Sequence, residues 1–443
     1  MADSQEISNI IKDIKRSKSD IKDISNIIKH LNTTDADYMY DNITQYDLLL
    51  CAIKNNYVKI LKYLIKVGID ITDQNQTGNK LVFNAISKNR IKCLRILINA
   101  KVNLDFQNQF GNTALLVAAK DNYTNCIKII INAGANLNIC NNKGDTALHM
   151  LARNDNLECL IYLVRAGANL NILNNKGYTV LHITIEMSNI DCLIYLINVM
   201  PNLNIRDNSG KTALFMATEF SNEAHIKLLI EAGADIEICD NNGDSPLIIA
   251  LIHDHEDCVK LLIDAGANIE VCNNNGEYPL IIASINGYED CVKYLIDAGA
   301  NIEVCNNNGE SPLCAAVFGG SIECVKLLIN AGANINFCNS ENNTILYQLI
   351  DNGNYLEIYD DMREELIYMF MEAGANYDNC MRNSIVRSWV MATDMKKIKQ
   401  ELLEIKEHLA DIEMRPGIGQ YYFEHKARFE SVLDKFSNLN SFD

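Results

Sequence analysis

Three residues of types that bind metals stand close together in the chain. His253, His255 and Cys258 fall within the string HDHEDC, and imidazole and thiolate groups are ligands that zinc prefers. A closed zinc site usually takes its four ligands from two closely spaced pairs, and this string supplies only part of such a set. The pattern therefore predicts no metal site, and we expect no metal and no cofactor.

Twelve of the 15 Cys residues follow a regular spacing rather than a disulfide pattern. One set recurs at multiples of 33 residues, with His225 at its missing step: Cys93, Cys126, Cys159, Cys192, Cys258, Cys291 and Cys324. A second set has the same period: Cys140, Cys239, Cys272, Cys305 and Cys338. Residues one period apart belong to neighbouring repeats, whereas disulfide frameworks occur in small secreted domains. We therefore predict reduced thiols in an intracellular protein.

The chain contains no sequence motif that would place a reaction. It has no phosphate-binding loop, dinucleotide-binding glycine motif, nucleophile elbow or His-Glu-x-x-His string, the patterns that position many catalytic groups. No catalytic residue is therefore predicted, and we expect a protein that is not an enzyme.

Charge and hydropathy disfavour several classes of partner. The 57 Asp and Glu residues outnumber the 39 Lys and Arg residues, so the net charge is −18. An acidic chain repels phosphate groups on average, which disfavours binding to nucleic acid or to a membrane surface. No stretch approaches the ~18 apolar residues of a membrane span, and the start of the chain is too polar for a signal peptide. We therefore expect an intracellular, cytoplasmic protein.

Two sets of Gly residues indicate a tandem array. The first recurs at multiples of 33 residues, with Lys101 and Met200 at its gaps: Gly68, Gly134, Gly167, Gly233, Gly266, Gly299 and Gly332. The second has no gap: Gly78, Gly111, Gly144, Gly177, Gly210, Gly243, Gly276 and Gly309. A fixed period of this length is typical of a repeat solenoid.

Each repeat predicts two short helices. A Gly turn is followed by a Thr or Ser that can cap a helix N-terminus, such as Thr146 or Ser311. Pro246, Pro279 and Pro312 then take the first helical position, where a missing N–H costs nothing. A polar break leads to a second helix with one apolar face, and a left-handed Gly ends that helix.

The repeats resemble ankyrin repeats, most clearly in NNKGDTALHMLARNDNLECLIYLVRAGANLNIL (141–173) and NNNGESPLCAAVFGGSIECVKLLINAGANINFC (306–338). The resemblance implies an all-α repeat solenoid in which each unit is a β-turn followed by two antiparallel helices. It also implies that His149 and His182, in the Thr-Pro-Leu-His box of their units, are structural and not catalytic.

The chain is predicted to have three parts. An N-terminal helical cap or coiled-coil-like segment (1–41) precedes an array (42–380), and a C-terminal helical segment (381–443) follows it. The expected units are 42–74, 75–107, 108–140, 141–173, 174–206, 207–239, 240–272, 273–305, 306–338 and 339–380, the last with an insertion. The first two lack the Thr-Pro-Leu-His box.

One helix end departs from the pattern. Met200-Pro201 replaces the usual Gly-Ala, and Met adopts the positive φ of Gly only with strain. We therefore expect a distorted helix end and a local change in stacking between Val199 and Asn208.

Charge divides the array into two halves. Residues 41–206 hold 17 basic and 11 acidic residues, whereas residues 207–380 hold 6 basic and 29 acidic residues. Opposite potentials along one array can select different partners. The alternative is that the acidic residues only keep a long, Asn-rich array in solution.

Partners of ankyrin-repeat proteins usually contact the turn tips and the first helices, so the resemblance implies a contact stripe. In the acidic half it would comprise Asp244, Glu277 and Glu310, with Asn242, Asn275 and Asn308 beside them. In the basic half it would comprise Lys143, Lys176, Arg206 and Lys211. The same residues can be turn formers alone, because tight turns require Asn, Asp and Gly.

Both ends of the chain predict helices. Apolar residues share heptad positions near the start, including Ile7, Ile14, Ile21 and Ile28, and a shorter seam runs from Met395 to Ile412. We expect both ends to cap the array, since terminal repeats need a polar outer face, and Trp389 to pack on the last repeat. The alternative is helix pairing with a partner or with a second copy.

The expected function is a non-enzymatic protein-protein interaction scaffold that holds a protein partner on its concave face. The composition and the long array resemble those of giant DNA viruses or intracellular bacteria, which would make the partner a host protein and the location the host cytoplasm. One alternative is an adaptor that recruits a target to machinery such as a ubiquitin ligase. Another is a hydroxylation substrate or decoy for an asparaginyl oxygenase, at Asn138, Asn171, Asn204 and Asn336.

Overall fold

The computed structural model describes residues 45–66, 71, 77–338, 343–350, 360–377, 386–388 and 391. The predicted N-terminal segment, Trp389 and the C-terminal seam lie outside these residues. The chain divides into two compact units, Met1–Asn274 and Asn275–Asp443, and each unit is described by itself. In the described ranges the structure is helical, with one isolated bridge between Cys338 and Thr344 and no strand.

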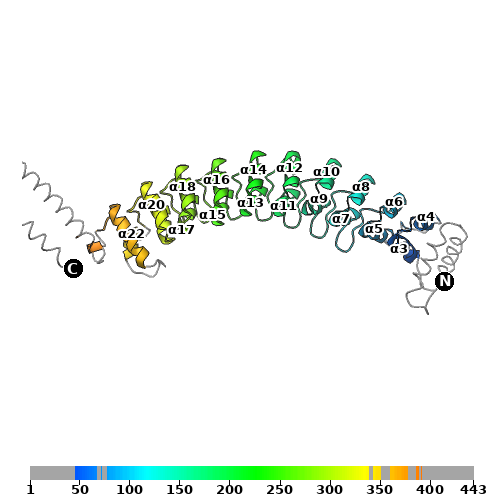
Figure 1. The fold of residues 1–443 in the computed structure, drawn as a ribbon, viewed down its shortest axis with the longest axis horizontal. Coiled ribbons are helices and arrows are strands. Elements are labelled where there is room, and N and C mark those ends of the chain that lie inside the picture. The colour runs from blue at the N-terminus through cyan, green and yellow to red at the C-terminus, as the bar shows by residue number, and fades with distance from the viewer. Residues whose placement is uncertain are drawn as a thin grey trace, which may run out of the picture. The chain divides into compact units, whose positions relative to one another are not determined.

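Helices in the first unit come in pairs, one pair for each repeat. They are α3 (Gln45–Lys54), α4 (Val58–Lys66), α5 (Thr77–Ser87), α6 (Ile91–Asn99), α7 (Ala114–Lys120), α8 (Thr124–Asn132), α9 (Ala147–Arg153), α10 (Leu157–Arg165), α11 (Val180–Glu186), α12 (Ile190–Val199), α13 (Ala213–Glu219), α14 (Glu223–Glu231), α15 (Pro246–Ile252) and α16 (Glu256–Asp264). The odd-numbered helices pack side by side in an inner row, and the even-numbered helices form an outer row. Figure 1 shows the two rows, and the all-α repeat solenoid predicted from the sequence is confirmed.

The second unit repeats this pairing. Its helices are α17 (Pro279–Asn286), α18 (Glu289–Asp297), α19 (Pro312–Phe318), α20 (Ile322–Asn330), α21 (Ile345–Ile350) and α22 (Asp360–Glu372). Helix α17 packs on α19, and α18 packs on α20, so this unit has the same inner and outer rows.

The ends of the inner helices follow from local sequence. Thr113, Thr212 and Ser245 cap α7, α13 and α15, and each side chain accepts a hydrogen bond from the backbone N–H three residues on. Pro stands at the start of α15, α17 and α19, as the sequence predicts. These helices are only seven or eight residues long, so packing of their apolar residues, and not helix propensity, must stabilise them.

The core lies between the two helices of each repeat and between neighbouring repeats. In α8, Cys126, Ile127 and Ile130 have no exposed surface, and they share one helix face because their spacing matches the helical period. The equivalent residues of the other outer helices are buried too, which gives the first unit one continuous apolar layer.

The helix end at Met200 differs from its neighbours, as the sequence predicts. Gly167 and Gly233 have φ values of +90° and +85°, whereas Met200 has an extended backbone with φ −82° and ψ 127°. Helix α12 is one residue longer than α10 and α14, and the Met200 side chain is buried. The left-handed turn is therefore replaced, because a residue before Pro favours an extended conformation.

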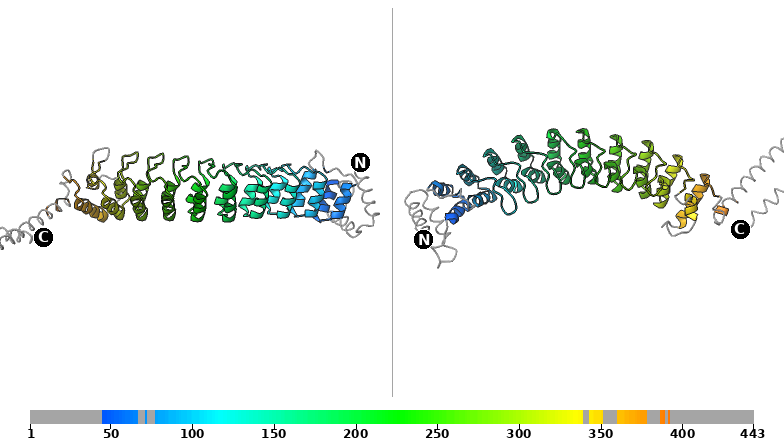
Figure 2. Two further views of the ribbon diagram at one scale, coloured as in Figure 1. Left: turned by 90° about the horizontal axis from the view of Figure 1, so that it is seen from above. Right: turned by 180° about the vertical axis from the view of Figure 1, so that it is seen from behind.

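Loops project from one edge of the helix rows and connect each repeat to the next. Figure 2 shows them in the first unit, where each loop leads into an inner helix. We call these loops fingers. No helix among the described residues is long and apolar enough to cross a membrane.

Candidate partner-binding surface

Each finger is a tight turn held by one Asn or Asp side chain. In the finger Asn141–Asp145, the Asn141 N–H donates to the Asp145 carbonyl (3.0 Å), and the Gly144 N–H donates to the Asn141 carbonyl (2.9 Å). The Asn141 Oδ1 atom accepts from the N–H groups of Lys143 (2.9 Å) and Asp145 (3.0 Å). The turn therefore satisfies its own backbone and keeps its shape without a partner.

Gly144 is required in this finger for two reasons. Its φ is +78°, a conformation that costs other residues free energy. A Cβ atom at this position would also lie 2.7 Å from the backbone nitrogen of Asn175, in the next finger. Only Gly lets the two fingers approach so closely.

A ladder of Asn residues joins successive fingers of the first unit. Each of these Asn side chains donates from Nδ2 to the carbonyl of the residue one repeat earlier, at 2.9–3.3 Å: Asn142, Asn175, Asn208, Asn241 and Asn274. Their backbone N–H groups also donate to the preceding finger, for example Asn175 to the Lys143 carbonyl (3.0 Å). We call this set the asparagine ladder. It fixes the spacing of the finger tips along the unit.

The sequence predicted no contact of this kind, although a signal for it was present. Asn recurs at the same position of six successive repeats, from Asn142 to Asn307, and Asn in a tight turn is commonly a turn former. Turn formation belongs instead to the preceding residue, such as Asn141, whose side chain caps its own turn. The Asn residues of the ladder form hydrogen bonds between neighbouring repeats.

His149 and His182 connect the inner helices to the next finger. The Nδ1 atom of His149 accepts from the Thr146 N–H (3.1 Å), so its Nε2 atom carries the proton and lies 2.9 Å from the Tyr178 carbonyl. His182 makes the same pair of contacts, to Thr179 and to the Lys211 carbonyl. Burial lowers the pKa of both imidazoles below the usual value, which keeps them neutral and structural.

The acidic residues expected in the contact stripe lie at the base of the fingers. Asp244 is only 7% exposed, and its Oδ1 atom accepts from Asn273 Nδ2 (2.9 Å). Asp145 and Asn174 form the same pair three repeats earlier in the chain (2.9 Å). Glu310 is half-buried and its Oε2 atom accepts from Asn306 Nδ2 (2.7 Å), and Glu277 is half-buried. The carboxylates of Asp244 and Glu310 therefore support the fingers, and little of Asp244 is left for a partner to touch.

The exposed residues of the stripe lie at the finger tips. Asn242, Asn275 and Asn308 are exposed, as are Lys143 and Lys176. The Lys176 ammonium lies 3.0 Å from Glu186 Oε1 and 5.1 Å from the centre of the Tyr178 ring. This position, and not the one after the Gly, is the accessible part of the turn.

Arg206 and Lys211 already make contacts within the chain. The Arg206 Nε atom donates to the Gly210 carbonyl (2.8 Å), although much of the side chain is exposed. Lys211 is half-buried and pairs with Glu219 at 2.7 Å. The four basic residues of the stripe therefore include two exposed tips and two that brace the turn or the helix behind it.

The four Asn residues considered for hydroxylation lie in the extended stretch before each finger. Asn138, Asn171 and Asn336 are exposed, and Asn204 is half-buried. The Oδ1 atoms of Asn138, Asn204 and Asn336 each accept a backbone N–H from the following unit, at 2.7–3.0 Å. These three side chains therefore link neighbouring repeats.

The string HDHEDC takes part in packing. His255 Nδ1 lies 3.0 Å from the Thr218 carbonyl, and the rings of His253 and His255 stack. The Cys258 thiol is buried and lies 3.8 Å from Ser221 Oγ. In the part of the chain that the structure describes, no group of three His, Cys, Asp or Glu residues is placed to hold a metal ion.

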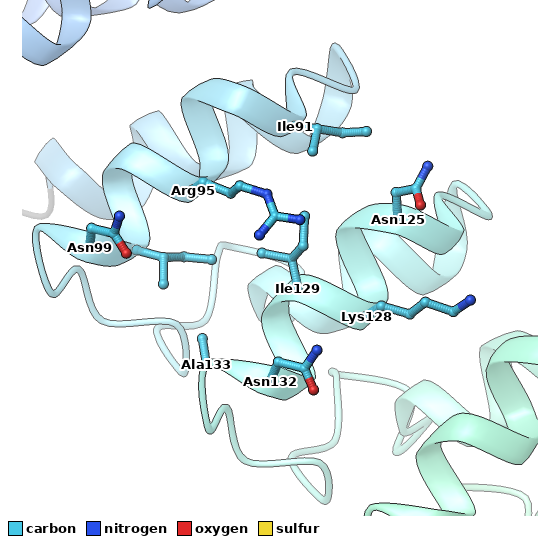
Figure 3. Close-up of a pocket in the computed structure, with 9 residues that line it drawn as sticks. Ile91, Arg95, Asn99, Asn125, Lys128, Ile129, Asn132 and Ala133 are labelled. Atoms are coloured by element: carbon cyan, nitrogen blue, oxygen red, sulfur yellow. The ribbon is translucent and has the colours of Figure 1, made fainter.

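A shallow groove lies away from the fingers, between outer helices α6 and α8 (Figure 3). Its volume is about 470 Å³. Arg95 extends from α6 towards Ile129 on α8, and Lys128 lies on the α8 side. The lining combines aliphatic side chains, amides and two cations, which suits a protein surface better than a small reacting molecule.

A comparison with family models agrees with this geometry. A family model described as ankyrin repeats (3 copies) matches residues 82–174, 152–240, 221–306 and 298–367. No curated protein matches the chain. Among solved structures, the ankyrin repeat domain of Bcl-3, titled a unique member of the IkappaB protein family, is 28% identical, with a TM-score of 0.44, and the match covers 46% of this chain and 94% of that chain. Because the family matches run together over more than half of the sequence, this chain belongs to the ankyrin-repeat family.

Proposed function

We propose that this chain is a non-enzymatic scaffold that binds a protein partner along its fingers and inner helices. Ankyrin repeats are generally protein–protein interaction modules. The observation that carries the proposal is the asparagine ladder, which holds the exposed tips of successive fingers in one fixed row. A surface held in its binding conformation loses little conformational entropy when a partner binds.

The proposed partner of the first unit presents an acidic surface. Lys143 and Lys176 stand at neighbouring finger tips and are exposed, and complementary charge mainly raises the rate and the specificity of association. The next two exposed tips, Ser209 and Asn242, are uncharged, so the basic contact is confined to one part of the finger row. We further propose a host protein as the partner, in keeping with the resemblance to arrays of viruses and intracellular bacteria.

The test compares two charge reversals in the full chain. The tip variant Lys143→Glu/Lys176→Glu places acidic groups at two finger tips. The matched control Lys88→Glu/Lys120→Glu makes the same charge change at exposed residues near the opposite ends of the inner helices. Each tagged protein is used to capture partners from a candidate host lysate at low and at physiological salt, with quantification by mass spectrometry.

We expect one or a few proteins to bind the wild type and the control equally and to be depleted at least about tenfold with the tip variant. Binding should weaken as salt increases, because the contacts are exposed and charged. A partner set that is identical for all three proteins would contradict the proposed surface. Unchanged circular dichroism of both variants controls for misfolding.

A further inference from the structure

The outer row of the first unit carries a charge gradient. Here the outer row means α4, α6, α8, α10, α12, α14 and α16. Counting the Lys, Arg, Asp and Glu within each helix gives net charges of +3, +2, +1, 0, −1, −1 and −2 in that order. The charge therefore falls along the row and crosses zero near α10 and α12.

An apolar patch lies where the charge crosses zero. Ile190 and Ile194 of α12 are 41% and 43% exposed, and they share one helix face because they are four residues apart. Among the described residues of the outer row, these are the large hydrophobic side chains with the greatest exposure. Ile161 of α10, one repeat before Ile194, is half-buried beside them.

The apolar residues at this position differ from the residues that the other outer helices carry there. At the position of Ile161 and Ile194 the other outer helices carry a cation: Lys62, Arg95, Lys128, Lys227 and Lys260. An exposed Lys at this position is compatible with the fold, so packing within the unit does not require Ile. Contiguous exposed apolar side chains on a soluble protein mark an interaction site.

We propose that the outer row binds the outer row of a second copy of this chain, antiparallel and related by a two-fold axis between α10 and α12. A two-fold interface must be self-complementary, because each surface meets its own copy. In this arrangement α8 (+1) faces α14 (−1), and α6 (+2) faces α16 (−2). The apolar patch of α10 and α12 faces its own copy at the centre.

The arrangement of the rows allows such a dimer. Figure 1 shows the outer row on the outer side of the arc of the first unit, so two copies would touch first at the centre of their rows. The apolar patch lies at that centre, and the charged ends set the antiparallel orientation through their longer-range attraction. The fingers project from another edge of the unit and stay accessible.

The first test is the mass of the full chain in solution, measured by sedimentation velocity up to about 100 μM, where a micromolar interface is mostly occupied. We expect a dimer for the wild type. Ile194→Lys should raise the dimer dissociation constant at least about tenfold, because each interface loses two apolar side chains and gains two like charges. Phe110→Lys is the matched control: Phe110 is 61% exposed on a finger, where the next two units carry Lys143 and Lys176.

The second test is a charge exchange between α6 and α16. Arg95→Glu and Asp264→Lys should each weaken the dimer about threefold at low salt. The double variant should recover the wild-type dissociation constant, because each new Glu then faces a new Lys in the other copy. Recovery would distinguish the antiparallel two-fold arrangement from any other contact of the same residues.

Three results would overturn the proposal. The first is a monomeric wild type at the highest concentration. The second is a dimer that Ile194→Lys leaves unchanged, which would assign pairing to another surface, such as the end segments. The third is a double variant that is weaker than both single variants. The thermal unfolding of every variant is measured alongside, so that a folding defect is recognised.

Discussion

His225 is a buried polar residue whose side chain makes no hydrogen bond in the described structure. Its side chain is 2% exposed, and neither ring nitrogen has a hydrogen-bond partner in the described structure. A buried polar group without a partner costs about 1–3 kcal/mol. Every other unit with an outer helix of this type, from α6 to α20, has Cys at the same position, for example Cys192 and Cys258.

His225→Cys is therefore expected to stabilise the chain by about 1 kcal/mol, part of the gain being lost to the smaller volume of Cys. Urea unfolding of the two proteins at pH 7 measures the difference. The reciprocal variant Cys192→His is the control, and it should destabilise the chain because it brings a second imidazole into the same kind of site. A His225→Cys protein no more stable than the wild type would show that water or a neighbouring group satisfies the ring.

His149 and His182 make the stability depend on pH. Burial lowers the pKa of each imidazole in the folded chain, while the unfolded chain keeps the ordinary value of about 6.5. The stabilising contribution is therefore complete above about pH 6.5, and it is lost as the pH falls below that value, because the unfolded state then binds more protons.

We expect the urea midpoint to fall between pH 7 and pH 5. The variant His149→Leu/His182→Leu should have a lower midpoint at pH 7 but a smaller decrease on acidification. Leu suits this comparison because Leu116 occupies the equivalent position of α7 and is buried. An equal pH dependence in both proteins would assign it to other groups.

At the scale of elements, the finger depends on its neighbour. Asn208 donates from Nδ2 to the Asn175 carbonyl (2.9 Å) and from its backbone N–H to the Lys176 carbonyl (3.2 Å). Asn208→Ala removes the first bond and leaves the second. An exposed hydrogen bond adds little to global stability, so the effect should be a local opening of the finger.

We expect hydrogen exchange of the Asn208 and Gly210 amides to become about threefold to tenfold faster in Asn208→Ala, with the helix amides unchanged. Asn125→Ala on α8 is the control, because Asn125 is exposed and lies outside the ladder. Unchanged exchange at the finger would show that the backbone bonds alone hold its position.

The sequence predicted these elements well because their signals are local. Gly144, Thr146 and Pro246 act through backbone geometry and capping within a few residues, and the helices begin and end where those signals place them. Burial of the contact stripe could not be predicted in this way. Asp244 is buried by Asn273, which lies 29 residues further along the chain.

At the scale of the whole molecule, the two Cys sets differ in environment. Thiols of the first set are buried, and burial raises the pKa of Cys126 to about 11 and that of Cys192 to about 12. Cys93 and Cys126 also lie 3.6 and 3.5 Å from the Oδ1 atoms of Asn56 and Asn89, in the preceding unit. In the second set, Cys272, Cys305 and Cys338 are exposed.

Thiol labelling with iodoacetamide at pH 8 should therefore separate the two sets. We expect Cys272, Cys305 and Cys338 to react at least about 100-fold faster than Cys126 and Cys192, because only thiolates react and access requires opening of the fold. Peptide mass spectrometry over time measures the rates, and labelling in urea is the control in which the difference disappears. Rapid native labelling of Cys126 would contradict the packing of the outer row.

The sequence by itself determined the period and the pairing of helices within a repeat, because both depend on residues that recur at one spacing, and its motifs indicated the ankyrin-repeat family. The tertiary structure decided which recurring residues reach the solvent. Asp244 and Lys143 stand in equivalent turns, yet Asp244 is held under the finger and Lys143 is exposed at its tip. Exposure depends on the side chains that the neighbouring units bring into contact, and those lie about one period away in the chain.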